Sequence, residues 1–406
     1  MSPVDLNVKR PIPPSIVQVL PAEPLLLMGA GPVPVPAEVA RAGGLVINHL
    51  GDTMNMVVDG VKEMARYVFQ TQDDKIFGVS GPASAAMEMA MGSLLWPGRK
   101  VLVLKMGTFS NRFAEMAAGV GAEVEILEVA DGEPVRAEMV ERKLAGGNYD
   151  VVTAVQGETS CGVWTRDLPQ IACLARRAGA LMVADAVCTL STMPLKKDEW
   201  GIDVVFTGSQ KGLSSLPGVA LIAISDAAWE TLHQHPGPKP HWCLDARRAQ
   251  NFWGNHTYHY TAPVTGLLAL YEALRLICEE KLEQRFARHR HSSLALQAGV
   301  EGMGLRLSIG PEHRLNSVLA IDIPAGADGA AARRYMAERF KVQISESYGR
   351  DIVRIGQMGE QCRAPNLFRT LHALGVAFSR EGAKLDLSRG MAELEAHLIQ
   401  HAAGVL

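Results

Sequence analysis

A lysine that could act as a nucleophile lies in the stretch GSQKG, residues 208–212. Apolar runs flank it, IDVVFTG before it and GVALIAIS after it, and both are typical of buried strands. Lys211 is therefore expected to point into the interior. In a dry pocket the pKa of a lysine amine falls, and the neutral amine can form an imine with an aldehyde. The alternative is a lysine that buries its stem and extends its amine to solvent.

An acidic residue interrupts another apolar run. Asp185 lies within MVADAV, and no basic residue stands within five positions of it. A buried carboxylate is costly unless a cation pairs with it. The protonated ring nitrogen of a heterocyclic cofactor would supply that cation; a salt bridge to a distant arginine is the alternative.

Small and aromatic residues follow three other expected strands. The backbone N–H groups of Ala83 and Ser84, after Gly81 and Pro82, would begin a helix and form an anion site that suits phosphate. Phe109 could lie flat on a planar ligand, and Thr159 in GETSCGV could bind a ring hydroxyl. Separately these features also fit a capped helix, a core aromatic and a polar loop.

Together the five features describe one ligand. It has a phosphate, a flat ring, a ring hydroxyl, a basic ring nitrogen and an aldehyde, which is the composition of pyridoxal 5′-phosphate (PLP). A lysine that bonds to the aldehyde and an aspartate at the ring nitrogen are the expected pair for this cofactor.

Seven apolar segments alternate with helical stretches and would position these residues. Most are continuous apolar runs, as in strands covered on both faces, so we expect an α/β fold with a mostly parallel, mixed seven-stranded sheet. Ligands of such sheets bind outside the carboxyl ends of the strands. The expected strands are residues 75–80, 100–106, 122–129, 150–156, 180–187, 203–208 and 219–225.

The pattern changes after about residue 265 and predicts a smaller α+β domain. A long helical region, possibly interrupted, covers residues 266–304, and a helix is expected over 329–340. Strands are expected at residues 317–324, 342–347 and 351–358, followed by two more helices. We predict an N-terminal extended arm over residues 1–27, a large PLP-binding domain over 28–280 and a small C-terminal domain over 281–406.

The overall composition excludes several classes of protein. A chain of 406 residues favours two domains, and a net charge of −3 gives no reason to expect nucleic-acid binding. No run of 18 apolar residues predicts a membrane span, and the proline-rich start lacks the apolar core of a signal peptide. The six cysteines show no metal-ligand spacing, so we expect no metal and a cytoplasmic location.

Four segments resemble a known family. They are GSQKGLSSLPG (208–218), VADAV (183–187), GETSCGV (157–163) and RIGQMG (354–359). They are similar to the class V aminotransferases of PLP fold type I, within the subgroup that contains the alanine–, serine– and ureidoglycine–glyoxylate and the pyridoxamine–pyruvate transaminases. The resemblance implies a transaminase (EC 2.6.1.-) that moves an amino group from a small donor to glyoxylate or pyruvate by a ping-pong mechanism. It also implies a homodimer with active sites at the subunit interface.

The resemblance implies a role for each cofactor residue. Lys211 would form the covalent bond to PLP and Asp185 would keep its ring nitrogen protonated, so both would be catalytic. The remaining cofactor contacts would be phosphate ligands, ring contacts and two residues that reach the partner subunit's phosphate: Ala83, Ser84 and Gln210 with Ser209 nearby, then Phe109, Val187 and Thr159, then Tyr258 and Thr261.

Three residues would contact the substrate by the same resemblance. Arg354 would bind the substrate carboxylate through its planar guanidinium. Asn48 and His49 stand in a segment that lines the substrate pocket of the family, where relatives commonly have Gly-His or Gly-Gln. A second departure is Pro82-Ala83-Ser84, where relatives usually read Ser-Gly-Thr or Ser-Gly-His, so one side-chain contact to phosphate could be missing.

Other functions stay open at this stage. Alanine, serine, ureidoglycine and pyridoxamine are all possible donors, so a pyridoxamine–pyruvate transaminase is the main alternative. A PLP-dependent lyase or desulfurase would need a mobile catalytic cysteine, and Cys362 follows RIGQMG too closely for that role. A nicotinamide-dependent dehydrogenase is disfavoured because prolines follow the G-x-G of MGAGPVPVP (28–36) and prevent the required helix. A silent binding protein with the same fold is a further alternative.

Overall fold

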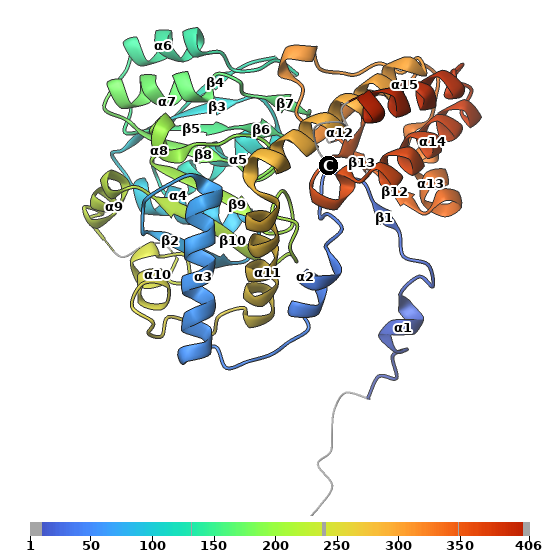
Figure 1. Cartoon of the computed structure of the whole chain (residues 1–406). Helices are drawn as coiled ribbons and strands as arrows, with labels where there is room; N and C mark the ends of the chain where they lie inside the picture. Colours follow the sequence, from blue (N-terminus) through green and yellow to red (C-terminus); the bar gives the residue numbers. More distant parts are fainter. Residues whose placement is uncertain (1–9, 131, 238–240, 348, 401–406) are drawn as a thin grey trace, which may run out of the picture.

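A seven-stranded sheet forms the centre of the computed structural model, which describes residues 10–130, 132–237, 241–347 and 349–400 (Figure 1). The strand order is β2-β10-β9-β8-β5-β3-β4. Of these seven strands, β10 alone runs antiparallel to its neighbours, so the predicted mostly parallel, mixed sheet is confirmed. The strands are β2 Ile76–Ser80, β3 Lys100–Lys105, β4 Glu123–Glu128, β5 Val151–Val155, β8 Leu181–Asp185, β9 Val204–Gly208 and β10 Val219–Ile224.

Continuous apolar sequence explains why this sheet is buried. Every residue of β5, β9 and β10 is buried, as expected of strands that helices cover on both faces. Helix α4 contacts β9 and β10, and α5 contacts β3, β4 and β5. In Figure 1, α3 and α11 lie side by side in front of the sheet, and these two helices are in contact.

The helical stretches expected between the strands are present, and α4 and α7 are two of them. In the described part of the chain, none of the helices combines the length and the apolar character needed to cross a membrane. The helices are α2 Ala37–Ala42, α3 Asp52–Phe69, α4 Ala83–Leu94, α5 Thr108–Gly119, α6 Ala137–Ala145, α7 Leu168–Arg177, α8 Lys197–Trp200, α9 Asp226–His233, α10 Ala246–Trp253 and α11 Val264–Glu280, with the short strands β6 Gly157–Glu158 and β7 Val163–Trp164.

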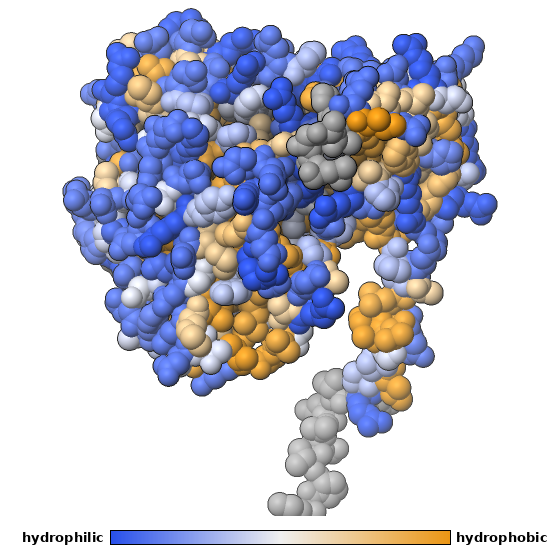
Figure 2. All heavy atoms as spheres, in the orientation of Figure 1, coloured by the Kyte–Doolittle hydropathy of each residue, from blue (hydrophilic) through white to orange (hydrophobic). Residues whose placement is uncertain are grey.

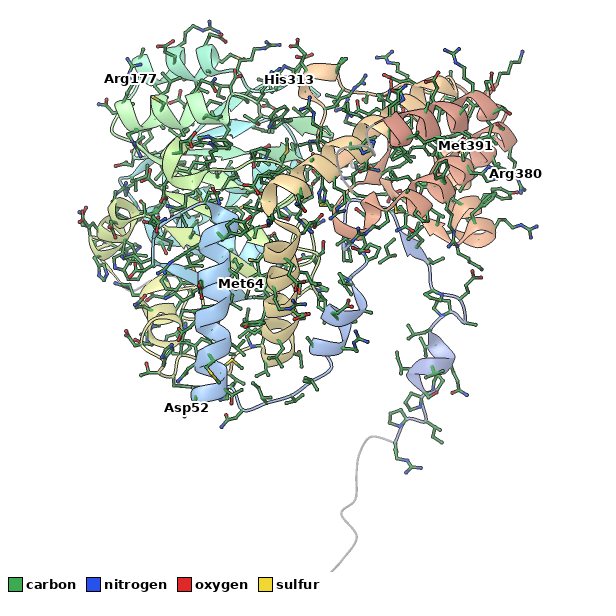
Figure 3. All side chains as sticks on the ribbon, viewed as in Figure 1. Asp52, Met64, Arg177, His313, Arg380 and Met391 are labelled. Atoms are coloured by element: carbon green, nitrogen blue, oxygen red, sulfur yellow. The ribbon has the colours of Figure 1, made fainter. Side chains whose placement is uncertain are left out.

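The C-terminal part has its own apolar core beneath a three-stranded antiparallel sheet of order β11-β14-β13. The long helical region is interrupted between α11 and α12 at Lys281, whose φ is 65°. Arg380 and Met391, labelled in Figure 3, lie on the last two helices of this C-terminal part, α14 and α15. The elements are α12 Leu282–Gly302, η1 Pro311–His313, β11 Val318–Asp322, α13 Gly329–Phe340, β13 Ser345–Glu346, β14 Ile352–Gly356, η2 Gly359–Cys362, α14 Ala364–Arg380 and α15 Leu387–Gln400.

The start of the described chain joins this C-terminal part rather than the large sheet. Strand β1 (Leu26–Leu27) pairs in parallel with β12 (Val342–Gln343). The single strand expected over 342–347 is therefore divided, since β12 pairs with β1 whereas β13 pairs with β14. Ahead of β1, the chain extends away from the body and contains one helical turn, α1 (Ile16–Val19) (Figure 1). The division into domains at residues 27/28 and 280/281 stays a prediction.

Candidate active site

A cavity of about 200 Å³ lies at the carboxyl ends of the sheet strands. It brings together most of the residues that the sequence predicted to bind a cofactor. Its lining also includes side chains that the sequence analysis did not single out, among them Arg112 and Cys188. The full lining is Pro82, Ala83, Ser84, Met87, Phe109, Arg112, Val155, Gly157, Thr159, Asp185, Val187, Cys188, Gln210 and Lys211.

Lys211 follows β9 and points into this cavity. Its Nζ donates a hydrogen bond to the carbonyl oxygen of Ala30. A side chain at Gly31, whose φ is +97°, would place a Cβ only 2.7 Å from this Nζ, so glycine leaves the room that the lysine occupies. Burial is the main cause that lowers the pKa of the Lys211 amine. Such an amine is a better nucleophile and base near neutral pH than an exposed one.

Asp185 ends β8 on the same side of the cavity. Its Oδ1 accepts a hydrogen bond of 2.8 Å from the backbone N–H of Val187. Burial raises the pKa of its carboxyl to about 7. Among the described residues no basic side chain forms an ion pair with it, so the alternative of a salt bridge to a distant arginine is not observed.

The predicted phosphate site lies at the start of α4. Pro82 is the N-cap, and Ala83 and Ser84 are the first two helical residues, so their N–H groups have no partner within the helix. The Gln210 side chain has a buried amide oxygen, Oε1, that has no hydrogen-bond partner among the described residues. Ser209 lies outside the lining, and its hydroxyl donates to the carbonyl oxygen of Leu216 at 2.5 Å.

Phe109 lies one turn before Arg112 on α5, and the guanidinium carbon of Arg112 is 4.7 Å from the centre of the phenyl ring. Arg112 Nη1 also donates to the Ser84 hydroxyl at 2.9 Å, so this arginine connects α5 to the start of α4. The i, i+3 spacing of the two residues on a helix is a signal in the sequence that could have identified Arg112.

A buried carboxylate fixes the start of α5. Glu158 accepts hydrogen bonds from the backbone N–H groups of Ser110 at 2.8 Å and Phe109 at 3.3 Å. A negative charge suits a helix N-terminus, where these N–H groups have no helical partner. Glu158 therefore helps to hold Phe109 at the cavity.

The remaining predicted residues lie outside the lining. Arg354 on β14 is buried and donates to the Thr159 carbonyl oxygen at 2.5 Å and to that of Glu346 at 3.0 Å. Arg354 thus connects the small sheet to the loop that carries Thr159. Thr159 itself lines the cavity.

Asn48, His49, Tyr258 and Thr261 lie at the surface and not in the cavity of their own chain. The Asn48 side chain accepts a hydrogen bond from the N–H of Leu50 at 3.2 Å. The rings of His49 and Tyr258 meet edge to face with centres 5.9 Å apart, so these two segments are neighbours. Tyr258 is 58% exposed.

Two cysteines bear on the chemistry. The Cys188 thiol lines the cavity and donates to the Gly157 carbonyl oxygen at 3.1 Å, and burial raises its pKa to about 12. It is therefore neutral and weakly nucleophilic. Cys362 is buried outside the lining, and its thiol donates to the Gln357 carbonyl oxygen at 3.1 Å.

Comparison with known proteins gives a consistent picture. The family model described as aminotransferase class-V matches residues 37–369. Alanine–glyoxylate aminotransferase of Felis catus is 33% identical over an alignment of 364 residues that covers 87% of this chain and 88% of the relative. The structure of ureidoglycine–glyoxylate aminotransferase from Bacillus subtilis superposes with a TM-score of 0.89 at 31% identity, covering 93% of this chain and 99% of the other. Pyridoxamine–pyruvate aminotransferase from Mesorhizobium loti gives a TM-score of 0.89 at 26% identity, with 94% and 98% covered.

Proposed function

We propose, because the chain belongs to the class V aminotransferase family, that it transfers an amino group from a small donor to glyoxylate or pyruvate. The donor class is an amino acid such as alanine or serine, or a ureidoglycine-like compound. One observation carries the proposal: a partly buried lysine amine of lowered pKa and a buried carboxyl without a basic partner line the same cavity.

The residues of the cavity fit PLP, the cofactor that this family uses. The buried Asp185 carboxyl lacks a cationic partner, and a protonated pyridine nitrogen would provide one. The N–H groups of Ala83 and Ser84 offer donors to a phosphate, and the buried amide of Gln210 can turn its N–H₂ toward the same group. Phe109 and Val187 would contact the two faces of the ring, and Thr159 its hydroxyl.

Lys211 is the residue to which we assign proton transfer. When bound, PLP withdraws electrons from the substrate and stabilises the negative charge that forms at its Cα. The Nζ of Lys211, whose pKa is lowered by burial, would take the Cα proton and later return a proton to the reacting group. Asp185, once ionised beside the cationic ring nitrogen, would hold that nitrogen in its protonated form.

The substrate carboxylate is assigned to Arg354. Its guanidinium now donates to backbone carbonyl oxygens of Thr159 and Glu346, so it is already held in one orientation. A planar guanidinium fixed in this way can bind a carboxylate through two parallel hydrogen bonds. That contact would orient the Cα–H bond relative to Lys211.

A homodimer would complete the site, since Asn48, His49, Tyr258 and Thr261 lie away from the cavity of their own chain. Exposed apolar residues surround them. Leu45, Val46, Met56 and Trp242 are all more than half exposed, and Val46 is 81% exposed. Figure 2 shows apolar atoms along the lower edge of the body, where the segment between α2 and α3 runs toward Asp52 (Figure 3). A contiguous apolar surface of this kind favours association.

The N-terminal arm adds a second exposed apolar surface, which Figure 2 shows in the segment that extends from the body. An isolated helical turn with apolar side chains is not stable alone in water, so it favours contact with another chain. Its exposed side chains are Ile12, Ile16, Val17, Val19 and Leu20. A cytoplasmic location stays a prediction.

A PLP-dependent lyase that uses a cysteine is less well supported. Cys188 is the thiol that lines the cavity, but burial raises its pKa to about 12, which leaves little thiolate at neutral pH. Cys362 is buried outside the cavity. Neither cysteine therefore offers a mobile, ionised thiol to the substrate.

The experiment that tests the function is a panel of donors against the PLP-loaded enzyme. Alanine, serine, ureidoglycine, aspartate and pyridoxamine are each added alone, and the absorbance change of the half-reaction is recorded. We expect rapid conversion with at least one amino acid and recovery of the original spectrum with glyoxylate or pyruvate. Conversion with pyridoxamine but with none of the other donors would favour the pyridoxamine–pyruvate alternative. Sulfide release from cysteine would favour the lyase.

A further inference from the structure

A second and larger cavity lies between elements at the edge of the large sheet and α12. Its volume is about 760 Å³, against about 200 Å³ for the cavity at Lys211, and the two share no lining residue. Its walls come from β7, α8 and the start of α7 on one side, and from α12 and the η1 region on the other. His313 in Figure 3 marks the position of η1. The volume falls in the range of small-molecule sites, about 300–1,000 Å³.

Aromatic rings form the walls of this groove. Trp164, Trp200 and Phe286 line it, and each is only partly buried. Leu294 on α12 adds an apolar side chain that is 41% exposed. Partly exposed aromatic rings suit a flat apolar ligand, because such rings stack with little loss of side-chain freedom.

The charge of the groove is positive. Arg314 is paired with Glu301 at 2.8 Å, but among the described residues no carboxylate pairs with Arg166 or Arg290. The Arg166 guanidinium lies 5.8 Å from the centre of the Trp164 ring. Glu312 is the one acidic side chain in the lining. Two unpaired guanidinium groups beside aromatic rings favour a ligand that carries a carboxylate.

One residue of the lining, Gln156, carries a buried hydrogen-bond acceptor. Gln156 is 1% exposed, and its Nε2 donates to the Pro194 carbonyl oxygen at 2.8 Å. Since a carbonyl oxygen can only accept, this contact fixes the orientation of the amide. Its Oε1 is then buried without a partner among the described residues. An unpaired buried acceptor is costly, so a ligand that donates a hydrogen bond to it gains affinity.

We propose that this groove is a second ligand site, for an aromatic carboxylate whose ring bears a hydrogen-bond donor at the end opposite the carboxylate. The ring lies between the aromatic walls, the donor reaches Gln156 Oε1, and the carboxylate meets Arg166 and Arg290. The proposal uses none of the residues assigned to amino transfer, so it does not depend on the proposed function.

The test is calorimetric titration of the PLP-loaded enzyme with 4-hydroxyphenylacetate. Phenylacetate, which lacks the donor, should bind at least fivefold more weakly. Tyramine (4-hydroxyphenethylamine), which carries a positive charge in place of the carboxylate, should bind at least tenfold more weakly. The double variant Arg166→Gln/Arg290→Gln should lose at least tenfold in affinity for 4-hydroxyphenylacetate. Both arginines are exposed, so this variant is expected to fold, which its unfolding temperature checks.

A matched control is Arg177→Gln, an exposed arginine on α7 outside the groove, which should bind 4-hydroxyphenylacetate like the parent enzyme. Unchanged affinity in the double variant would overturn the proposal, because the carboxylate would then bind elsewhere, such as near Lys211. Equal affinity for tyramine would overturn it as well. A crystal soaked with 4-hydroxyphenylacetate should show the ring beside Trp164 and Trp200; density only in the Lys211 cavity would contradict it.

Discussion

Two ionisable side chains, the partly buried Lys211 and the buried Asp185, account for the proposed chemistry at the scale of single residues. Burial lowers the pKa of the Lys211 amine and raises that of the Asp185 carboxyl to about 7, so burial favours the neutral form of both groups. In the protein without a ligand, burying these two groups therefore adds no electrostatic stability to the fold. Perturbed groups of this kind gather at functional sites, and here both would be satisfied by one bound cofactor.

Replacing Lys211 by alanine should abolish catalysis. The variant lacks the amine to which we assign proton transfer, and such a base contributes about 10²–10⁴-fold to the rate. The variant should also lose the absorbance near the visible edge that the covalent bond between lysine and PLP produces. Lys196→Ala, at an exposed lysine paired with Glu199, is the control and should behave like the parent. A rate comparable to the parent in Lys211→Ala would refute the assignment.

Replacing Asp185 by asparagine should stabilise the cofactor-free protein at alkaline pH. The folded carboxyl keeps its proton up to a pKa of about 7, whereas the unfolded one releases it near 3.8. The parent protein therefore loses stability as the pH rises through this window. Asparagine can still accept the Val187 N–H and has no charge to bury. Its advantage in unfolding free energy should grow by about 2–3 kcal/mol between pH 5 and pH 8.

The measurement is chemical denaturation of both cofactor-free proteins at pH 5, 6.5 and 8. An advantage that does not change with pH would mean that Asp185 titrates near its ordinary value. Addition of PLP should reverse the effect, because the asparagine cannot pair with the protonated ring nitrogen. The loaded variant should then keep its fold and lose most of its transamination rate; normal activity would remove the argument for the ring nitrogen.

At the scale of elements, local sequence was sufficient for the main sheet. Strands such as β5, VVTAV, are apolar apart from Thr153 and end at a polar residue or glycine, so their position and burial could be predicted within a residue or two. The strand-end position then indicated Lys211, Asp185 and Phe109 as cavity residues, and all three line it.

Features that depend on distant partners were not predictable in the same way. The division of the strand over 342–347 depends on β1, which lies more than 300 residues earlier in the sequence. The Cys188 thiol is held at the cavity by a hydrogen bond to the Gly157 carbonyl oxygen. No local sequence pattern predicts this contact. The exposure of Tyr258 on its own chain likewise follows from how separate segments pack.

The turn after Lys211 gives a prediction for an element. A Cβ on Gly212 would come within 2.2 Å of the Leu190 carbonyl oxygen, which is backbone and cannot move aside cheaply. Gly212→Ala should therefore cost about 1–3 kcal/mol of unfolding free energy and should displace Lys211, which lowers kcat. Gly119→Ala at the end of α5 is the control, since no atom lies within 4 Å of the new methyl group there. Parent-like stability and kcat in Gly212→Ala would show that the segment carrying Leu190 yields easily.

At the scale of the whole molecule, the surface that contains His49 and Tyr258 determines whether the site is complete. A two-fold dimer places the same patch of each subunit in contact, so one substitution introduces two charges into the interface. Val46→Asp should therefore give a monomer, because a carboxylate desolvated without a partner costs several kcal/mol. If Tyr258 and Thr261 reach the phosphate of the partner subunit, the monomer should bind PLP at least tenfold more weakly.

Sedimentation velocity and PLP titration measure these two effects of Val46→Asp. The control is Ile399→Asp, at an exposed residue on α15, which should change neither. A parent protein that sediments as a monomer with full PLP affinity would contradict the shared site, because a single chain would then supply every phosphate contact.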